Sequence, residues 1–203
     1  MINGYRKNFN DAYAYGRVAE SQIARWLIHA EGWITLPAYE IEIPSGKGPR
    51  LFTFIEELIV PDILAMRYKH RKFQLRWHEA KHKTRFSWHW TSKNWQTGID
   101  LRHYNDYIEV QKQTVEVYIL FLHSCSTPSK SDLEHDSPAL CPTGLFGRPL
   151  SYLMEHVHHK DAFDRNGREY PMVYWNHSDL ELLATLEQVQ TLPVSLWKEP
   201  AKV

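Results

Sequence analysis

Residues 58–83 have the sequence LIVPDILAMRYKHRKFQLRWHEAKHK, in which two apolar stretches are separated by a basic turn. The stretches at 58–66 and 72–82 are rich in the branched and aromatic residues typical of β-strands. A short turn between two such stretches favours an antiparallel hairpin. The segment therefore predicts two neighbouring antiparallel strands.

The second predicted strand carries charged residues on an otherwise apolar face. Successive side chains of a strand point to opposite faces, so one face presents Phe73, Leu75, Trp77, Glu79 and Lys81. On the first strand, Asp62 likewise shares its face with apolar residues. Burying a charge there is costly unless the charge is paired or binds a metal ion. Two interpretations follow: a buried Glu79–Lys81 ion pair with Asp62 in a turn, or a chemical site.

A third acid comes from a predicted helix at residues 16–31, where Glu20 borders the apolar face and Gly32 follows as a stop. Two neighbouring carboxylates do not both stay ionised without a cation. Mg²⁺ prefers oxygen ligands and is commonly held by one or two carboxylates plus substrate phosphates. A nearby lysine can orient a water or neutralise phosphoryl charge. These residues together predict a site for phosphodiester hydrolysis: Glu20, Asp62, Glu79 and Lys81.

The other elements of the first part of the chain complete an α-β-β-β-α-β order. An alternating segment at 33–43 predicts the first strand. Residues 98–115 are predicted to be helical, with Thr97 and Asp100 resembling a capping box. Residues 115–123 are a nearly continuous apolar run, as expected of a strand buried on both faces. The order predicts an α/β fold.

The rest of the chain is expected to add a loop and an extension to one domain spanning residues 1–203. Residues 124–150 are rich in Ser, Pro and Gly and predict a long loop or an insertion. A C-terminal extension at 151–203 follows the core at 16–123. Its predicted elements are a short helix at 151–159, a strand at 172–175 and a helix at 178–190.

The Pro61-Asp62 pair, followed after a hairpin by Glu79-Ala80-Lys81, resembles the motif of the PD-(D/E)xK phosphodiesterase superfamily. The resemblance covers residues 16–123. It implies a restriction-endonuclease-like core, with a mixed central sheet flanked by helices, and the activity of a metal-dependent DNA endonuclease. This chain is therefore expected to be a nuclease.

The same resemblance implies a role for each matching residue. Asp62 and Glu79 would bind Mg²⁺ or Mn²⁺, with the backbone carbonyl of Ala80 as a further ligand. Lys81 would act on the nucleophilic water, and Glu20 would support the metal site.

The resemblance is weaker on the second predicted helix. Some members carry a QxxxY motif there, whereas this chain has DLRHYNDYIEVQ. Tyr104 and Tyr107 are the residues of this helix that we expect to face the nucleic acid.

Positive charge and tryptophan are concentrated around the ExK motif. Residues 67–93 hold nine Lys and Arg and one acid, although the net charge of the chain is zero. Such a patch predicts binding of a polyanion, against the alternative of a solvated basic loop. Three residues are expected to bind phosphates: Lys83, Arg85 and Lys93. Three more would stack on bases or pack a loop onto the core: Trp88, Trp90 and Trp95.

Composition narrows the class of protein. No apolar run approaches the 18 residues of a transmembrane helix, and the start of the chain lacks the apolar region of a signal peptide. Two cysteines are too few for a disulfide framework, which fits a reducing cytoplasm. The predicted partner is DNA, with RNA as an alternative, and a homodimer would allow both strands to be cut.

Two alternatives to a nuclease remain from the residues alone. One is a non-catalytic nucleic-acid-binding module on the same fold. The other is a zinc-stabilised interaction protein, using His123, Cys125, His135 and Cys141, although their spacings match no standard zinc pattern.

Overall fold

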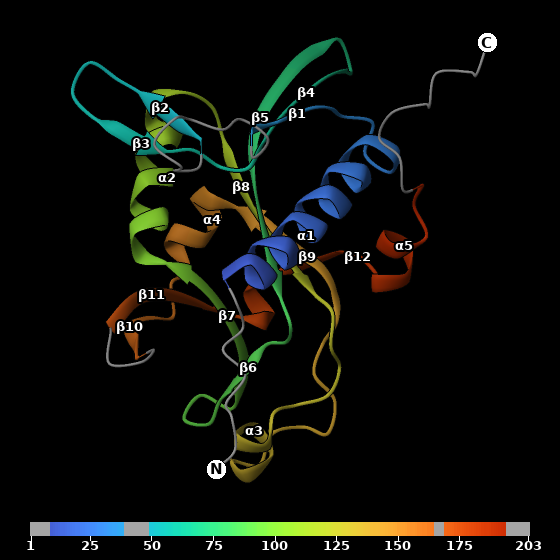
Figure 1. Ribbon diagram of the computed structural model, residues 1–203, viewed down its shortest axis with the longest axis vertical. Helices are drawn as coiled ribbons and strands as arrows, with labels where there is room; N and C mark the ends of the chain where they lie inside the picture. Colours follow the sequence, from blue (N-terminus) through green and yellow to red (C-terminus); the bar gives the residue numbers. More distant parts are fainter. Residues whose placement is uncertain (1–8, 39–48, 165–168, 194–203) are drawn as a thin grey trace.

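A six-stranded mixed sheet forms the centre of the protein (Figure 1), whose computed structural model describes residues 9–38, 49–164 and 169–193. The strand order is β1-β4-β5-β8-β9-β12. The bounds are β1 (Ile34–Pro37), β4 (Ile63–Lys69), β5 (Lys72–Lys83), β8 (Val117–His123), β9 (Gly144–Pro149) and β12 (Glu181–Ala184). Only β5 and β8 pair in parallel; the other neighbours are antiparallel. The prediction of an α/β fold with a mixed sheet is confirmed.

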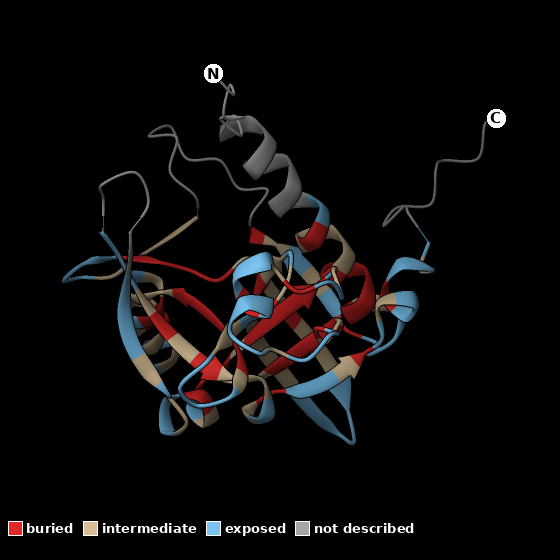
Figure 2. Cartoon of the chain, turned by 90° about the horizontal axis from the view of Figure 1, so that it is seen from below, coloured by how far each residue is buried: buried red, intermediate tan, exposed pale blue. Residues whose placement is uncertain are grey.

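Two long helices cover opposite faces of this sheet. Helix α1 (Phe9–His29) packs on the face that carries Ala80, Leu120 and Leu122. Helix α2 (Leu101–Gln113) packs on the other face, against Ile119 and Phe121, which alternate with the first set along β8. Figure 2 shows the buried residues concentrated along the strands and on the inner sides of the helices. β8 is thus buried on both faces, as its apolar run predicts.

The hairpin of β4 and β5 is the predicted one, and its turn has a left-handed backbone. Lys69 pairs with Lys72, and between them His70 and Arg71 have φ values of 52° and 60°. Two successive positive φ values are those of a type I′ turn, which matches the twist of the flanking strands. The usual Asn and Gly are replaced by two bulky basic residues.

The predicted strand at 58–66 is wrong in its continuity, because it is two strands. β3 (Glu57–Ile59) pairs with β2 (Arg50–Phe52), and β4 starts only at Ile63. Pro61 lies between the two strands. Because proline has no backbone N–H, it cannot donate a hydrogen bond to a neighbouring strand at this position. The predicted first strand at 33–43 is β1 as far as Pro37, and its residues 39–43 lie outside the described residues.

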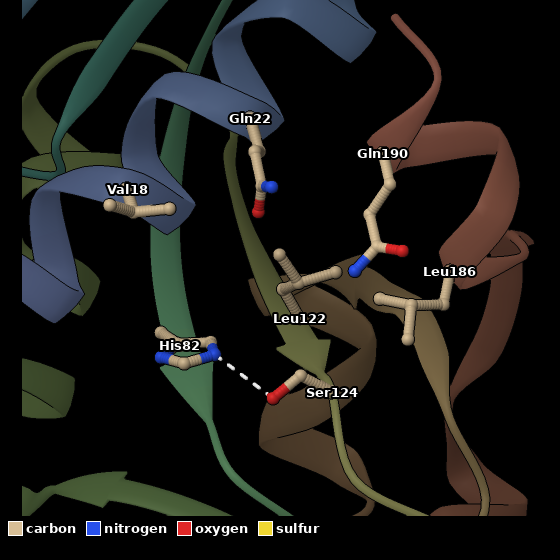
Figure 3. A pocket seen from close by; sticks show the side chains of 7 residues that line it. All are labelled: Val18, Gln22, His82, Leu122, Ser124, Leu186 and Gln190. Atoms are coloured by element: carbon tan, nitrogen blue, oxygen red, sulfur yellow. Dashed lines mark hydrogen bonds between the residues drawn. The ribbon is translucent and has the colours of Figure 1, made fainter.

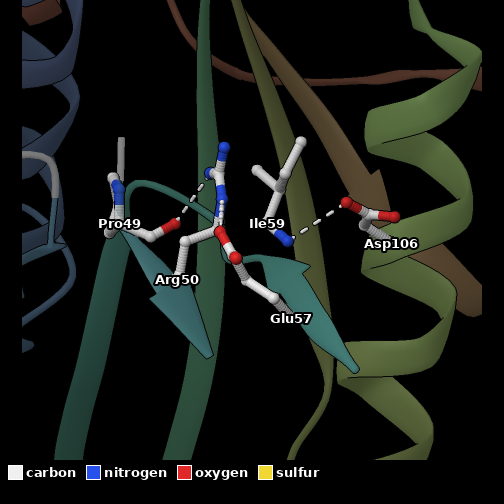
Figure 4. Close-up of polar contacts among 5 residues, drawn as sticks. All are labelled: Pro49, Arg50, Glu57, Ile59 and Asp106. Atoms are coloured by element: carbon white, nitrogen blue, oxygen red, sulfur yellow. Dashed lines mark hydrogen bonds and ion pairs between the residues drawn. The ribbon is translucent and has the colours of Figure 1, made fainter. Parts of the chain in front are cut away.

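The β2–β3 hairpin is tied to α2 and so fixes the chain just before Asp62. The backbone N–H of Ile59 donates to Oδ2 of Asp106 at 3.1 Å (Figure 4). Across the hairpin, Arg50 Nε donates to Glu57 Oε1 at 2.9 Å. The turn that carries Asp62 therefore starts from an anchored strand.

Residues 94–100 are a strand, β7 (Asn94–Asp100), so the predicted start of the second helix at 98 is wrong. Helix α2 begins at Leu101, and its N-cap is Asp100, whose Oδ1 accepts the N–H of Arg102 at 2.8 Å. Thr97 is buried in β7 opposite Trp175 instead of capping the helix. Pairing with a distant strand overrides the local helical pattern here.

β7 belongs to a second sheet, with the order β10-β11-β7-β6. Its other strands are β6 (Ser87–His89), β10 (His159–Asp164) and β11 (Glu169–Asn176). The predicted strand at 172–175 is part of β11. Gly98 permits the close approach of the two strands, because a Cβ there would lie 2.4 Å from the Val173 carbonyl oxygen.

The C-terminal part completes the central sheet instead of forming an extension beside it. The predicted helix at 178–190 is wrong: it is a 3-10 turn η2 (His177–Asp179), β12 and a short helix α5 (Leu186–Gln190). The predicted loop at 124–150 contains a helix, α3 (Lys130–Glu134), and the strand β9. Helix α4 (Leu150–Glu155) follows it and corresponds to the short helix predicted at 151–159. Leu182 pairs with Phe146, and β12 is extended because its backbone groups pair with the edge of β9.

Candidate active site

β4 and β5 bring Asp62 beside Glu79. Their antiparallel pairing places Ile63 opposite His78, so the residues one step further, Asp62 and Glu79, are neighbours across the two strands. The backbone N–H of Ala80 donates to Oδ2 of Asp62 at 3.0 Å. The two predicted carboxylates therefore meet at one place on the sheet.

Glu79 is fully buried and pairs with Lys81. Its side chain is 0% exposed, whereas that of Lys81 is 28% exposed, and the Nζ of Lys81 contacts Oε1 of Glu79. Burial raises the pKa of the Tyr107 hydroxyl, and a side-chain contact with Glu79 raises it further, so Lys81 and Tyr107 both face this carboxylate. A buried carboxylate is costly unless it is paired, and one that lies beside a second carboxylate is suited to bind a further cation.

The charges of the site are strongly coupled. Burial raises the pKa of Asp62 well above its usual value, and the negative charge of Glu79 raises it further. Burial lowers the pKa of Lys81, but the charges of Glu79 and Asp62 outweigh burial and leave it above its usual value. Lys81 is therefore an ammonium at neutral pH, and the two carboxylates repel each other across it.

Glu20 on α1 acts on the same group of charges. Its negative charge contributes to the raised pKa of both Asp62 and Lys81. The side chain of Glu20 is partly buried. The structure thus brings together the four predicted catalytic residues, from α1, from the bend before β4 and from β5.

The donors available to a metal ion are oxygens. Among the described residues, no group of three or more His, Cys, Asp and Glu side chains could hold a metal ion. Asp62 and Glu79 make a pair, and two carboxylates with water and substrate oxygens are a common environment for Mg²⁺. The buried Glu79 carboxylate beside Asp62 fits such a cation, and Ala80, whose carbonyl is the predicted further ligand, follows Glu79 on β5.

The zinc alternative lacks its ligand group in the described part of the chain. His123 is fully buried and stacks on Phe86, with ring centroids 3.5 Å apart. Cys141 is also buried, and its thiol donates to the backbone carbonyl of Phe86 at 3.8 Å. These two residues pack the core.

Helix α2 adds a tyrosine and a histidine that border the site. Tyr107 is 1% exposed; burial raises its pKa, and the charges of Glu79 and Asp62 raise it further. His103, one turn earlier, has its Nδ1 3.4 Å from the Tyr107 hydroxyl. Burial and the charge of Lys81 lower the pKa of His103. Sequence reasoning missed His103, although its spacing of four residues from Tyr107 is a helical signal.

The predicted contact of Tyr104 and Tyr107 with nucleic acid is not available in this conformation. The two rings are 5% and 1% exposed, and Tyr104 packs against Trp175 with centroids 5.9 Å apart. Their sequence spacing places them on the inner side of α2, where they pack in the hydrophobic core. They contact protein instead of solvent.

The three tryptophans after the ExK motif differ in exposure. Trp95 is buried, and Trp88 packs on it edge to face, with centroids 5.1 Å apart. The Nε1 of Trp88 also donates to the backbone carbonyl of His135 at 3.0 Å. Trp90 is 58% exposed. Of the three residues predicted to stack on bases, Trp90 alone presents a largely open ring, and Trp95 is a core residue.

The three predicted phosphate-binding cations also lie in different surroundings. Lys83 continues the face of Glu79 and Lys81 along β5, and burial together with the charge of Lys81 lowers its pKa to about 8. Arg85 donates to the Thr127 carbonyl at 2.7 Å, so part of its donor capacity is used. Lys93 is exposed beside β7. Lys83 is the one that extends the candidate site itself.

Comparison of the chain with models of protein families, with curated proteins and with solved structures finds no match. Within the part of the chain that the structure describes, no helix has both the length and the apolar character needed to span a membrane.

Proposed function

We propose that this protein is a divalent-metal-dependent nuclease that hydrolyses phosphodiester bonds of DNA. The observation that carries the proposal is the meeting of Asp62 and Glu79 across β4 and β5, with Lys81 paired to the buried Glu79. A site with two crowded carboxylates and one cation gains stability from a bound divalent cation.

The arrangement of the elements supports the likeness to the PD-(D/E)xK superfamily. In chain order, a helix is followed by three antiparallel strands, β1, β4 and β5. A helix on the opposite face then leads to β8, which pairs in parallel with β5. Taken over the central sheet alone, without β2, β3, β6 and β7, this succession is similar to the α-β-β-β-α-β order that the resemblance implies. Asp62 directly precedes its second strand, and the ExK residues lie on its third.

Each residue has a role that follows from its surroundings. Asp62 and Glu79 would hold Mg²⁺ or Mn²⁺, with the Ala80 carbonyl, and the cation would supply Lewis-acid activation of the phosphate. Lys81 stays protonated beside two carboxylates, so it orients the water and neutralises phosphoryl charge instead of accepting a proton. Glu20 adds negative charge that favours cation binding.

Access and charge favour a nucleic acid as the substrate. Lys81 is the partly exposed member of its ion pair, so solvent reaches the site at this residue. Nine Lys and Arg lie between residues 67 and 93 with one acid, and those that form no ion pair with a described acid are available to a polyphosphate backbone. Three of the nine, Arg67, Arg76 and Lys81, pair with Glu31, Glu116 and Glu79. Trp90 and Lys93 add an exposed ring and a cation.

A cleavage assay tests the proposal. Purified protein is incubated with duplex, branched and single-stranded DNA, and with RNA, in Mg²⁺, Mn²⁺ or EDTA. We expect cleavage of DNA with either metal and none in EDTA. Asp62→Asn and Lys81→Ala should each lower the rate at least roughly 10²-fold, as loss of an electrostatic catalytic group does.

The matched control is Lys112→Ala, which removes a lysine from an exposed ion pair with Glu109 on α2. It should cleave as the wild type does. Full activity in the Asp62→Asn, Lys81→Ala double variant would overturn the proposal. DNA binding that is indifferent to metal, without cleavage, would favour the non-catalytic module instead.

A further inference from the structure

A hollow lies on the α1 side of the central sheet. This is the face opposite to the one that carries Glu79 and Lys81 on β5. The hollow has a volume of about 470 Å³ and lies between α1, α5 and the ends of β5 and β8 (Figure 3). Seven side chains line it: Val18, Gln22, His82, Leu122, Ser124, Leu186 and Gln190. Its volume is within the roughly 300–1,000 Å³ of ligand pockets.

The lining of this pocket is largely aliphatic and polar. Val18, Leu122 and Leu186 supply aliphatic walls, and the set contains no Asp, Glu, Lys or Arg. The polar groups include His82 and Ser124, whose Nε2 and Oγ lie 3.2 Å apart. Aliphatic walls without Lys or Arg disfavour a phosphate or carboxylate inside the pocket and favour an uncharged ring.

Two amides in the lining accept and donate no hydrogen bond among the described residues. Figure 3 shows the side chains of Gln22 and Gln190 directed into the hollow from α1 and α5. No hydrogen bond from another described residue engages either amide. Each amide offers both donors and an acceptor. A planar ligand with donors and acceptors around its edge would satisfy both amides while its faces meet the aliphatic walls.

The pocket shares two structural elements with the candidate active site. His82 directly follows Lys81 on β5, and Gln22 lies on α1 two residues after Glu20. Ser124 directly follows β8, so the pocket lies at the carboxyl-terminal end of the parallel pair β5 and β8. Lys83 ends β5 at the same edge. A strand of nucleic acid at that edge would have its phosphates near the lysines and a base within reach of the pocket.

We propose that this pocket binds a single unpaired nucleobase. The identification of the base as part of the nucleic-acid substrate rests on the proposed nuclease function. The recognition itself does not, because a free nucleoside has the same neutral ring and the same edge. Insertion of an unpaired base would hold the strand at the end of β5.

Nucleoside binding is measured directly by calorimetric titration of the full chain, without divalent metal, with each of the four deoxynucleosides. Val18→Trp fills the hollow from an exposed position of α1, where Val18 is 57% exposed, and it should abolish binding. Gln22→Ala and Gln190→Ala should each weaken binding roughly 3- to 10-fold, as loss of a hydrogen bond does. The matched control is Gln113→Ala at the exposed end of α2, which should change nothing.

A second measurement connects the pocket with the substrate. Single-stranded and duplex oligonucleotides carrying the fluorescent base 2-aminopurine are titrated with the Lys81→Ala variant in EDTA. A change of emission with the single strand, lost on adding Val18→Trp, is the expected result. An equal change in the Val18→Trp variant would place the bound base elsewhere.

The two proposals fail in different ways. Saturable nucleoside binding that Val18→Trp removes supports the pocket even if no nucleic acid is ever cleaved. Absence of saturable binding by any of the four nucleosides, together with unchanged 2-aminopurine emission, overturns the pocket even if cleavage depends on Asp62 and Lys81. Thermal unfolding of each variant shows whether it is folded.

Discussion

The backbone N–H of Ala80 donates to Oδ2 of Asp62 at 3.0 Å, and this hydrogen bond joins the turn after Pro61 to the strand that carries Glu79 and Lys81. It uses one acceptor of Asp62 and keeps this carboxylate beside that of Glu79. Burial and the charge of Glu79 together raise the pKa of Asp62. Two adjacent buried carboxylates suit a bound cation, but without the cation their mutual repulsion and burial destabilise the folded protein.

Stability without metal should fall as pH rises, and Asp62 is the reason. Its folded-state pKa lies above the ordinary value of 3.8, so its contribution is present below about pH 4 and is lost as pH rises through the raised pKa. Asp62→Asn stays neutral and should lose less stability. Melting temperatures in EDTA over a pH series check this, and Mg²⁺ should restore the wild type at neutral pH. Parallel pH profiles for both proteins would contradict it.

Removing the cation of the buried ion pair should be costly. Breaking such a pair typically costs about 3–5 kcal/mol, and partial exposure of Lys81 moves the expected value for Lys81→Ala to about 2–3 kcal/mol. Urea unfolding in EDTA measures it. The control Lys112→Ala breaks an exposed pair and should cost less than about 1 kcal/mol. Equal losses in the two variants would show that Glu79 is not stabilised by Lys81.

Trp90 and Trp95 should respond to alanine in opposite ways. Trp90 is exposed, so Trp90→Ala should keep the melting temperature and weaken single-stranded DNA binding by about 1–3 kcal/mol, the value of one stacked base. Trp95→Ala should instead destabilise the fold by about 3–5 kcal/mol, because its side chain is buried. Fluorescence anisotropy, in a Lys81→Ala background, and thermal melts separate the two. Unchanged DNA affinity in Trp90→Ala would remove this residue from the interface.

The turn of the β4–β5 hairpin offers a stabilising substitution. Arg71 has a φ of 60°, a conformation that favours glycine. Arg71→Gly should therefore raise the free energy of unfolding by about 0.5–1 kcal/mol. Lys72→Gly, one residue later within β5, should lower it. Urea unfolding compares both with the wild type, and a loss of stability in Arg71→Gly would contradict the expectation.

The candidate site was accessible to sequence reasoning because it depends on local rules. Alternation along one strand places Glu79 and Lys81 on one face, and a short hairpin fixes which strand lies beside it. Helix α1 follows a clear period with Glu20 at its border. His103 was missed because its spacing from Tyr107 places the two on one helix face, but only the docked helix shows that this face borders the site.

The sequence by itself therefore determined the α/β class, the β4–β5 hairpin and the meeting of Asp62 with Glu79, since short-range periodicity and turn length suffice for them. Tertiary structure decided that residues 94–100 and 181–184 are strands. Thr97 pairs with Trp175 and Leu182 with Phe146, across long separations in the chain. The local patterns predict a helix at 98–100 and at 181–184, and pairing with a distant strand makes the extended conformation the more stable one there.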